Sequence, residues 1–312
     1  MTGRLVAGLA NTAAAFVFFA CGNVDRDYKG RSAEAWAAQL SAAAPEDRTA
    51  AADALYQIAP RSEVALSALL QAMRDPNDAV QRSVAAALST AGPRALPGLI
   101  EAIGDDHASV RALAIELLAN QGRGSEAAIP RIGTALADAD ENVRRAAAMA
   151  LAMYGESARS TAPQLAKAAR SGTPDSRAAA IVALSAVHAD TSAVISLLQR
   201  ALKDSAAVVR RAAIKAVLMT INDPAREFTL LVPLSRDRDT SVRLESYRAM
   251  GVLLGDQGTR ATAHAALIRA RADPDSSARR LVQQLLDPAP RPNPREERFG
   301  RVPRGVVVTH RP

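Results

Sequence analysis

An arginine recurs at a nearly constant distance along most of the chain. The successive intervals are 33, 30, 33, 33, 33, 33 and 36 residues. A period of this length, kept over eight copies, predicts stacked structural repeats, each of which completes its core only against its neighbours. The sequence therefore predicts one elongated array rather than two globular domains. The eight positions are Arg48, Gln81, Arg111, Arg144, Arg177, Arg210, Arg243 and Arg279.

The stretch DADENVRRAAAMAL at residues 138–151 typifies the first half of each repeat. Its apolar residues fall at helical spacing and predict a helix with one buried face. We expect Asp138 to be the N-cap of this helix, with Glu141 in a capping-box position, and the equivalent aspartates to cap the other copies. Proline after Asp75 and Asp273 suits a first helical position. The aspartates given this structural role are Asp75, Asp105, Asp138, Asp204, Asp237 and Asp273; the arginines paired with them, six residues later, are Arg111, Arg144, Arg210, Arg243 and Arg279.

A second amphipathic helix is predicted in the other half of each repeat. Pro97, Pro130 and Pro163 hold one register near its start, where a missing N–H is tolerated. Before the first repeat, Ser32 is expected to cap an additional helix over residues 32–43, because terminal repeats in such arrays are atypical.

This helix–turn–helix period, with its D-x₄-V-R-x-x-A-x-x-A-L pattern, resembles the HEAT repeat, in particular the short prokaryotic type of phycobilisome-lyase-like proteins. The resemblance covers residues 32–287 and implies an all-α fold, a right-handed α-solenoid of about seven helix pairs plus terminal capping helices. The pattern departs at Gln81, where Arg is replaced, and at Ala42 and Ser171, where Asp is replaced. Looser junctions are expected at those places.

By the same resemblance, the second helices line a concave surface suited to a protein partner. Polar residues recur on these helices, and two interpretations are open: a partner-binding ladder, or an ordinary solvated face. The polar ladder comprises Gln71, Glu101, Thr134, Lys167 and Arg200.

The N-terminus has the layout of a secretory signal, with Arg4 followed by an apolar stretch up to residue 20. The sequence FFAC, which ends at Cys21, resembles the lipobox of bacterial lipoproteins. This implies a signal peptide over residues 1–20, a lipidated Cys21 and export to the cell envelope. Gly22 is not the Asp that marks inner-membrane retention, which favours the outer membrane. Simple secretion and an uncleaved anchor are the alternatives, and residues 21–31 are predicted to be a tether.

The formal net charge of +7 is concentrated at the C-terminus, where residues 288–312 carry six arginines and two glutamates. The array itself is nearly neutral and offers no concentrated basic face, so nucleic-acid binding is not expected. The Pro- and Arg-rich composition predicts a disordered tail over residues 288–312. This tail is either a solvated terminus or a contact for an anionic envelope polymer.

The sequence contains no recognisable catalytic constellation. His107, His188, His264 and His310 are far apart, and the zinc-protease, serine-hydrolase and P-loop motifs are missing. We therefore expect no catalytic residue, no metal and no cofactor. The sequence predicts a non-enzymatic scaffold that binds unidentified proteins and is held on the membrane by its lipid anchor. A lyase-like enzyme or accessory factor, implied by resemblance alone, is the alternative.

Overall fold

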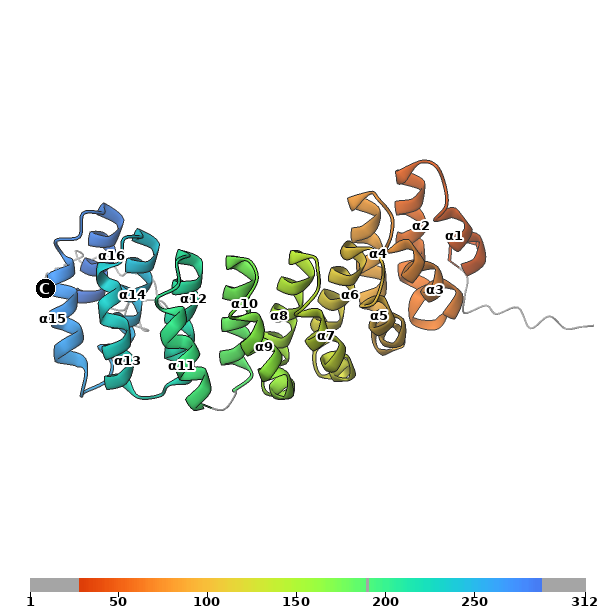
Figure 1. Ribbon diagram of the computed structural model, residues 1–312. Helices are drawn as coiled ribbons and strands as arrows, with labels where there is room; N and C mark the ends of the chain where they lie inside the picture. The colour runs from red at the N-terminus through yellow and green to blue at the C-terminus, as the bar shows by residue number, and fades with distance from the viewer. Residues whose placement is uncertain (1–27, 189–190, 288–312) are drawn as a thin grey trace, which may run out of the picture. The chain divides into compact units, whose positions relative to one another are not determined.

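The computed structural model describes residues 28–188 and 191–287 (Figure 1). Within these ranges the chain forms sixteen α-helices joined by turns and short 3-10 segments, without a β-strand. The helices make seven successive pairs, with α1 before the first pair and α16 after the last. The predicted all-α solenoid fold is therefore confirmed. The predicted signal peptide, Cys21 and the tail lie outside the described residues.

The chain divides after Ala91 into two compact units. In the first unit, the Ser32 hydroxyl accepts a hydrogen bond from the Ala35 N–H, so the predicted cap of the additional helix is confirmed. Helix α1 packs against both helices of the first pair, and α2 packs against α4. The helices of this unit are α1 (Ala33–Gln39), α2 (Pro45–Ile58), α3 (Glu63–Ala72) and α4 (Asp78–Ala91).

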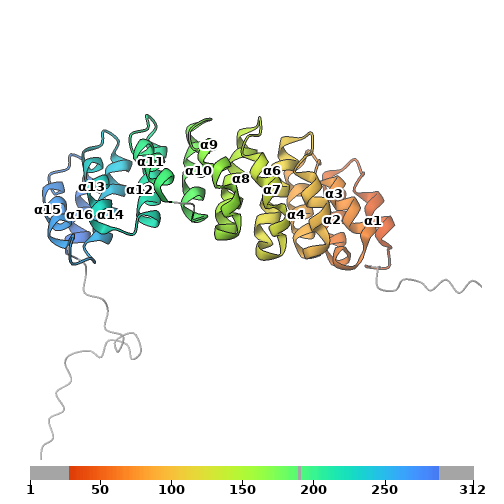
Figure 2. The same ribbon diagram turned by 60° about the horizontal axis from the view of Figure 1, so that its bottom comes forward.

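The second unit contains two rows of helices (Figures 1 and 2). Consecutive first helices from α6 to α16 pack directly against each other, and the second helices pack beside them. The first helices are α6 (Ala108–Asn120), α8 (Glu141–Tyr154), α10 (Pro174–Ala186), α12 (Ala207–Thr220), α14 (Thr240–Leu253) and α16 (Ser276–Leu286). The second helices are α5 (Leu96–Ala102), α7 (Ile129–Ala135), α9 (Ala162–Ala168), α11 (Thr191–Ala201), α13 (Pro224–Leu231) and α15 (Arg260–Ala270).

Small side chains are buried at one repeated position of the first helices. Four alanines, each three residues after a periodic arginine, are fully buried: Ala114, Ala147, Ala180 and Ala213. In α14 the same position holds the buried Ser246, whose hydroxyl donates to the Leu231 carbonyl at 3.0 Å. Because protein interiors are close-packed, side chains this small let helices approach closely. This accounts for the alanine-rich, aromatic-poor composition.

Several turns that follow the first helix of a pair contain a residue with positive φ, whereas those after α2 and α14 do not. Gly122 and Gly155 take this conformation at φ 62° and 56°, while His188 and Asn222 take it at 47° and 48°. Glycine adopts positive φ without strain, and asparagine and histidine tolerate it better than most residues. His188 is therefore accounted for as a turn residue. No helix in the described ranges is long and apolar enough to span a bilayer.

Candidate functional site

Five of the periodic arginines form ion pairs with an aspartate of the following repeat. Each guanidinium donates through Nε and Nη2 to the two carboxylate oxygens, in the parallel geometry that makes such bonds strong. In the pair Arg210–Asp237 these distances are 2.8 and 2.7 Å. We call each such pair an Arg–Asp brace. The braces are Arg48–Asp75, Arg111–Asp138, Arg177–Asp204, Arg210–Asp237 and Arg243–Asp273.

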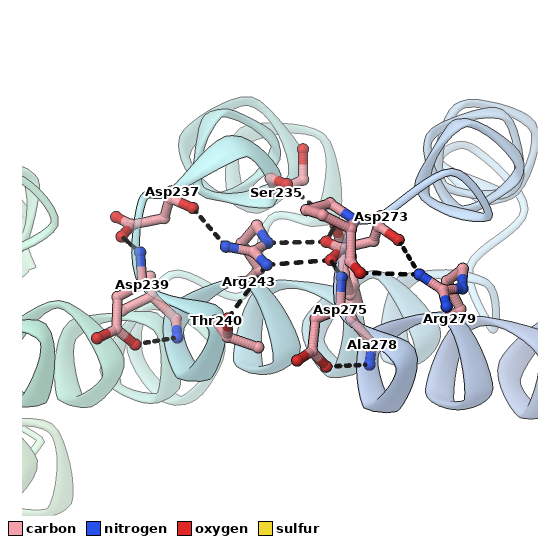
Figure 3. A network of polar contacts seen from close by, with 12 residues as sticks. Ser235, Asp237, Asp239, Thr240, Arg243, Asp273, Asp275, Ala278 and Arg279 are labelled. Atoms are coloured by element: carbon pink, nitrogen blue, oxygen red, sulfur yellow. Dashed lines mark hydrogen bonds and ion pairs between the residues drawn. The ribbon is translucent and has the colours of Figure 1, made fainter.

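The periodic arginines, including Arg279, which forms no brace with a described residue, also hold the turn that precedes their own helix. Nη1 of Arg243 donates to the carbonyl oxygen of Asp237 at 3.0 Å, and Nη1 of Arg279 donates to that of Asp273 at 2.7 Å (Figure 3). Within one repeat, the arginine thus bonds the backbone carbonyl of the aspartate six residues before it. The carboxylate of that aspartate bonds the arginine of the preceding repeat. Each brace therefore fixes one turn and links it to the next.

The prediction that these aspartates are the helix N-caps is wrong. Asp140, not Asp138, caps α8 by accepting hydrogen bonds from the N–H groups of Asn142 and Val143. The Asp138 carboxylate lies one turn earlier, where it accepts from the Asp140 N–H at 2.8 Å as well as from its arginine. Glu141 completes no capping box, since it accepts from the Thr173 hydroxyl.

Other repeats show the same shift by two residues. Asp239 caps α14 and Asp275 caps α16, two residues after Asp237 and Asp273 (Figure 3). The prolines that follow Asp75 and Asp273 therefore precede the helices, since α4 begins at Asp78 and α16 at Ser276. The sequence pattern D-x-D or D-x-N indicated these two roles, since its first residue forms the brace and its second polar residue caps the helix. Pro97, Pro130 and Pro163 do lie at the start of their helices, as predicted.

The most buried brace is Arg243–Asp273, whose side chains are 10% and 2% exposed. Burial alone would raise the pKa of the Asp273 carboxyl, but hydrogen bonds from Arg243, the Asp275 N–H and the Tyr247 hydroxyl lower this pKa to about 2. The Tyr247 hydroxyl lies 2.7 Å from Asp273 Oδ2, and burial together with this carboxylate raises the pKa of Tyr247. Asp273 therefore stays ionised in the folded chain at acid pH.

Acid is expected to destabilise the fold through these carboxylates. Because folding lowers the pKa of Asp273 from 3.8 to about 2, its contribution is complete above pH 4 and is lost as the pH falls towards 2. The linkage relation gives about 2 kcal/mol for a shift of this size. Urea titrations at pH 7, 4, 3 and 2 measure this loss. An Asp273→Asn variant should show a flatter pH dependence, and equal slopes for the two proteins would contradict the prediction.

One junction of the second unit lacks its brace although the arginine is present. Arg144 still donates through Nη1 to the carbonyl oxygens of Asp138 and Ala139, at 2.8 and 2.7 Å. The position that should hold its carboxylate partner is Ser171, whose hydroxyl donates to the Lys167 carbonyl instead. The Arg144 Nε is buried and has no hydrogen-bond partner. We call this place the Ser171 junction.

A cavity of about 640 Å³ opens at the Ser171 junction. Its lining includes Arg144 and Lys167, together with Thr134, Gly172 and Ser176. Two cationic side chains thus share one cavity, without an ion pair to Arg144 from any described residue. Such an arrangement can hold an anion, and we take it as the candidate binding site.

The polar ladder is only partly brought together. All five of its side chains are exposed, and Gln71 belongs to the first compact unit whereas the other four belong to the second. Thr134 and Lys167 line the same cavity, but Glu101 and Arg200 do not. Sequence reasoning found these two residues through their register, but it did not connect them with Arg144, which lies on a first helix.

The histidines form no site in the described part of the chain. His107 precedes α6, with its exposed Nδ1 3.1 Å from Asp105 Oδ1, and His264 is exposed on α15. His310 lies outside the described residues. Across residues 28–188 and 191–287, no group of three or more His, Cys, Asp or Glu is placed to hold a metal ion.

Sequence reasoning missed a row of exposed apolar side chains on the first helices of the second unit. Met149 and Met153 on α8, Met219 on α12 and Val252 on α14 are 53%, 60%, 56% and 66% exposed. Met153, Met219 and Val252 stand in one register, nine residues after the periodic arginine. Helices α8, α10, α12 and α14 are consecutive neighbours. We call these four residues the Met/Val row, which a search for apolar residues on the predicted outer face would have found.

These features define a HEAT-type helical-repeat protein, and comparison with known families agrees. The HEAT-repeat family model matches residues 33–119, 96–185 and 129–217, which together span more than half of the chain. The chain therefore belongs to the HEAT-repeat family. No sequence relative is found among curated proteins.

Solved structures show the same fold at low sequence identity. The Escherichia coli protein YibA is 20% identical, with a TM-score of 0.53, over 82% of this chain and 92% of that one. A structure of Kap95p with RanGDP is 12% identical, with a TM-score of 0.63. The match covers 83% of the present chain but only 41% of the chain in that structure. The complex of CpcE and CpcF of phycocyanin lyase from Nostoc is 21% identical, covers 82% and 94%, and has a TM-score of 0.39, too low to support a functional argument.

Proposed function

We propose that this protein is a non-enzymatic scaffold for protein–protein interaction, held on the bacterial cell envelope by a lipidated Cys21. The repeat fold itself is one used for protein interaction. The observation that carries the proposal is the Met/Val row, four large apolar side chains presented to solvent on α8, α12 and α14. Exposed apolar groups that lie in a row on one face suit a protein partner.

Methionine is suited to such a surface. Its unbranched side chain and polarisable sulfur adapt to differently shaped partners. Arg–Asp braces link α6 to the turn before α8, and α10, α12 and α14 in series, while the junction between α8 and α10 lacks its brace. A partner that binds here keeps its contacts over several repeats.

The test is crosslinking and pull-down of the lipidated full chain from intact envelopes. A Met153→Glu/Met219→Glu variant should lose the crosslinked partner because it places charges in the apolar contact. Asn120→Glu is the matched control, since Asn120 is exposed at the same register on α6. Retention of the same partners by the methionine variant would argue against this surface, and recovery of no partner by any form would sink the scaffold proposal.

The lipid anchor is tested separately. The full chain should incorporate a palmitate analogue in metabolic labelling, and Cys21→Ala should abolish this label because the sequence holds no other cysteine. A label that survives in Cys21→Ala would refute the anchor. Fractionation of the two membranes then tests the expected outer-membrane placement.

The remaining expectations stay predictions with their own tests. If the tail contacts an anionic envelope polymer, deletion of residues 288–312 should reduce salt-sensitive sedimentation with envelopes. Unchanged sedimentation would leave the tail as a solvated terminus. The lyase-like alternative rests on resemblance alone, and a tight visible-absorbing complex of the purified protein with a bilin would favour it.

A further inference from the structure

We infer that the Ser171 junction binds a carboxylate group supplied by a protein partner. The site deepens the scaffold proposal and rests on it only in assigning the carboxylate to a protein. The carboxylate would take the place that an aspartate holds in each of the five Arg–Asp braces. Arg144 would bind it through Nε and Nη2, and Lys167 would add a second positive charge.

The first argument is the position of the Arg144 guanidinium. Its Nη1 contacts the carbonyl oxygen of the residue six positions earlier at 2.8 Å, as it does in Arg111 and Arg210. The guanidinium is therefore held as in a braced junction, although its carboxylate partner is missing. Its buried Nε is left without an acceptor, which is unfavourable for a buried donor.

The second argument is that the chain does not close the space itself. Ser171 is too short to replace Asp, and its hydroxyl points back to the Lys167 carbonyl at 3.2 Å. Gly172 takes φ 95°, and a Cβ there would lie 2.8 Å from the Ser176 hydroxyl oxygen. The turn has thus adopted a different course from the braced turns, and the cavity of about 640 Å³ remains beside Arg144. A cavity of this volume admits a side chain from another molecule.

The third argument is the contrast with the other arginine position that departs from the pattern. At Gln81 the cation itself has been replaced, and Gln81 Nε2 donates to the Asp75 carbonyl at 2.8 Å. The uncharged Gln81 side chain thus makes the same bond to the turn that an arginine makes in the other repeats. At the Ser171 junction the cation is kept and the carboxylate is absent, so the charge is available to an external anion. The planar fork of arginine matches a planar carboxylate in two parallel bonds.

The test follows the Nε–H resonance of Arg144 in ¹⁵N-labelled full-length protein. One peptide carries a glutamate side chain and an amidated C-terminus, and a second is uncharged except for its C-terminal carboxylate and has a blocked N-terminus. At least one peptide should shift this resonance saturably, and the peptide that does so identifies the source of the carboxylate. Sodium chloride and inorganic phosphate at matched ionic strength are the controls. No shift with either peptide, or an equal shift with chloride or phosphate, would overturn the inference.

Two variants make the result specific. Ser171→Asp should place the Arg144 resonance at its shifted position before peptide is added and should weaken peptide binding at least tenfold. Arg144→Gln copies the substitution at Gln81, so it should keep the turn but abolish binding in a calorimetric titration. Arg145→Gln is the matched control, since this exposed neighbour should leave binding unchanged. Undiminished peptide binding by either Arg144→Gln or Ser171→Asp would refute the site.

Pull-down from envelopes separates this inference from the scaffold proposal. Loss of a partner by Ser171→Asp, with retention by wild type, supports both. Equal recovery by the two proteins supports the scaffold but refutes a role of this site in holding the partner. Recovery by neither refutes the scaffold, and the resonance measurement with purified protein still decides whether the junction binds carboxylate.

Discussion

Replacing Asp273 by alanine should lower the free energy of unfolding by about 3–5 kcal/mol, because it leaves the buried Arg243 guanidinium without its counter-charge. The lost partner accepts two hydrogen bonds from Arg243, at 2.7 and 3.0 Å, and lies 2.7 Å from the Tyr247 hydroxyl. In the variant the Tyr247 hydroxyl keeps the Ser235 carbonyl as an acceptor and Arg243 Nη2 keeps Thr240 Oγ1, but Arg243 Nε loses its described acceptor and the guanidinium loses its paired carboxylate. Urea unfolding followed by circular dichroism measures the change.

The matched control for this substitution is Asp287→Ala. Asp287 faces Arg271 at 3.8 Å, but the two side chains are 71% and 53% exposed. Solvent-exposed ion pairs contribute little, so the control should change stability by less than about 1 kcal/mol. Equal effects of the two substitutions would mean that the Arg–Asp brace contributes no more than a surface pair. Because repeat arrays unfold by neighbouring units, the early loss of α16 is the expected form of the destabilisation.

Replacing Ser171 by aspartate should raise the free energy of unfolding by about 1.5–3 kcal/mol, the range for hydrogen bonds to a charged group. The new carboxylate would complete the sixth Arg–Asp brace by accepting from Arg144. Gly172 makes this change feasible, because glycine can leave its positive φ and adopt the ordinary course of the turn. Thermal and urea unfolding at pH 7 measure the gain.

Two comparisons test the cause of that gain. Ser171→Asn has nearly the same shape without the charge and should give a much smaller increase. Combining Ser171→Asp with Arg144→Gln should remove the benefit, because the aspartate then faces no cation. An aspartate that stabilises equally with or without Arg144 would contradict the proposed bond and would point to a local effect on the turn.

The sequence predicted the repeats well because their spacing is a property of the chain alone. The buried alanines and the early prolines follow directly from that register. The role of the aspartates could not be predicted in the same way. Asp138 and Asp140 both suit an N-cap chemically, and only the three-dimensional stacking shows that Asp138 faces Arg111 of the preceding repeat. An Asp six residues before an Arg suggested a pair within one repeat, whereas the carboxylate pairs across repeats.

The candidate site was missed for the same reason. The sequence showed that Ser171 replaces an aspartate and predicted a looser junction there. It did not show which arginine would lose a partner, since Arg144 lies 27 residues earlier on another helix. The connection between Arg144 and Lys167 required the packing of α10 against both α8 and α9. The Met/Val row was missed because the apolar residues of the helices were assigned to the buried face, and the solvent-facing side of each helix was not considered.

The linkage between an arginine and the aspartate of the following repeat also affects how such a gene can change in length. Apart from the repeats with Gln81 and Ser171, a repeat between two others brings an aspartate for the preceding neighbour and an arginine for the following one. A duplicated block of one period would therefore find partners at both of its ends without any further mutation. Deletion of a whole period would rejoin an arginine and an aspartate in the same way. A duplicated block that begins at Ser171 would again have a serine in place of the aspartate. Each copy would therefore leave one more arginine without its carboxylate, and duplication there would add binding sites as well as length.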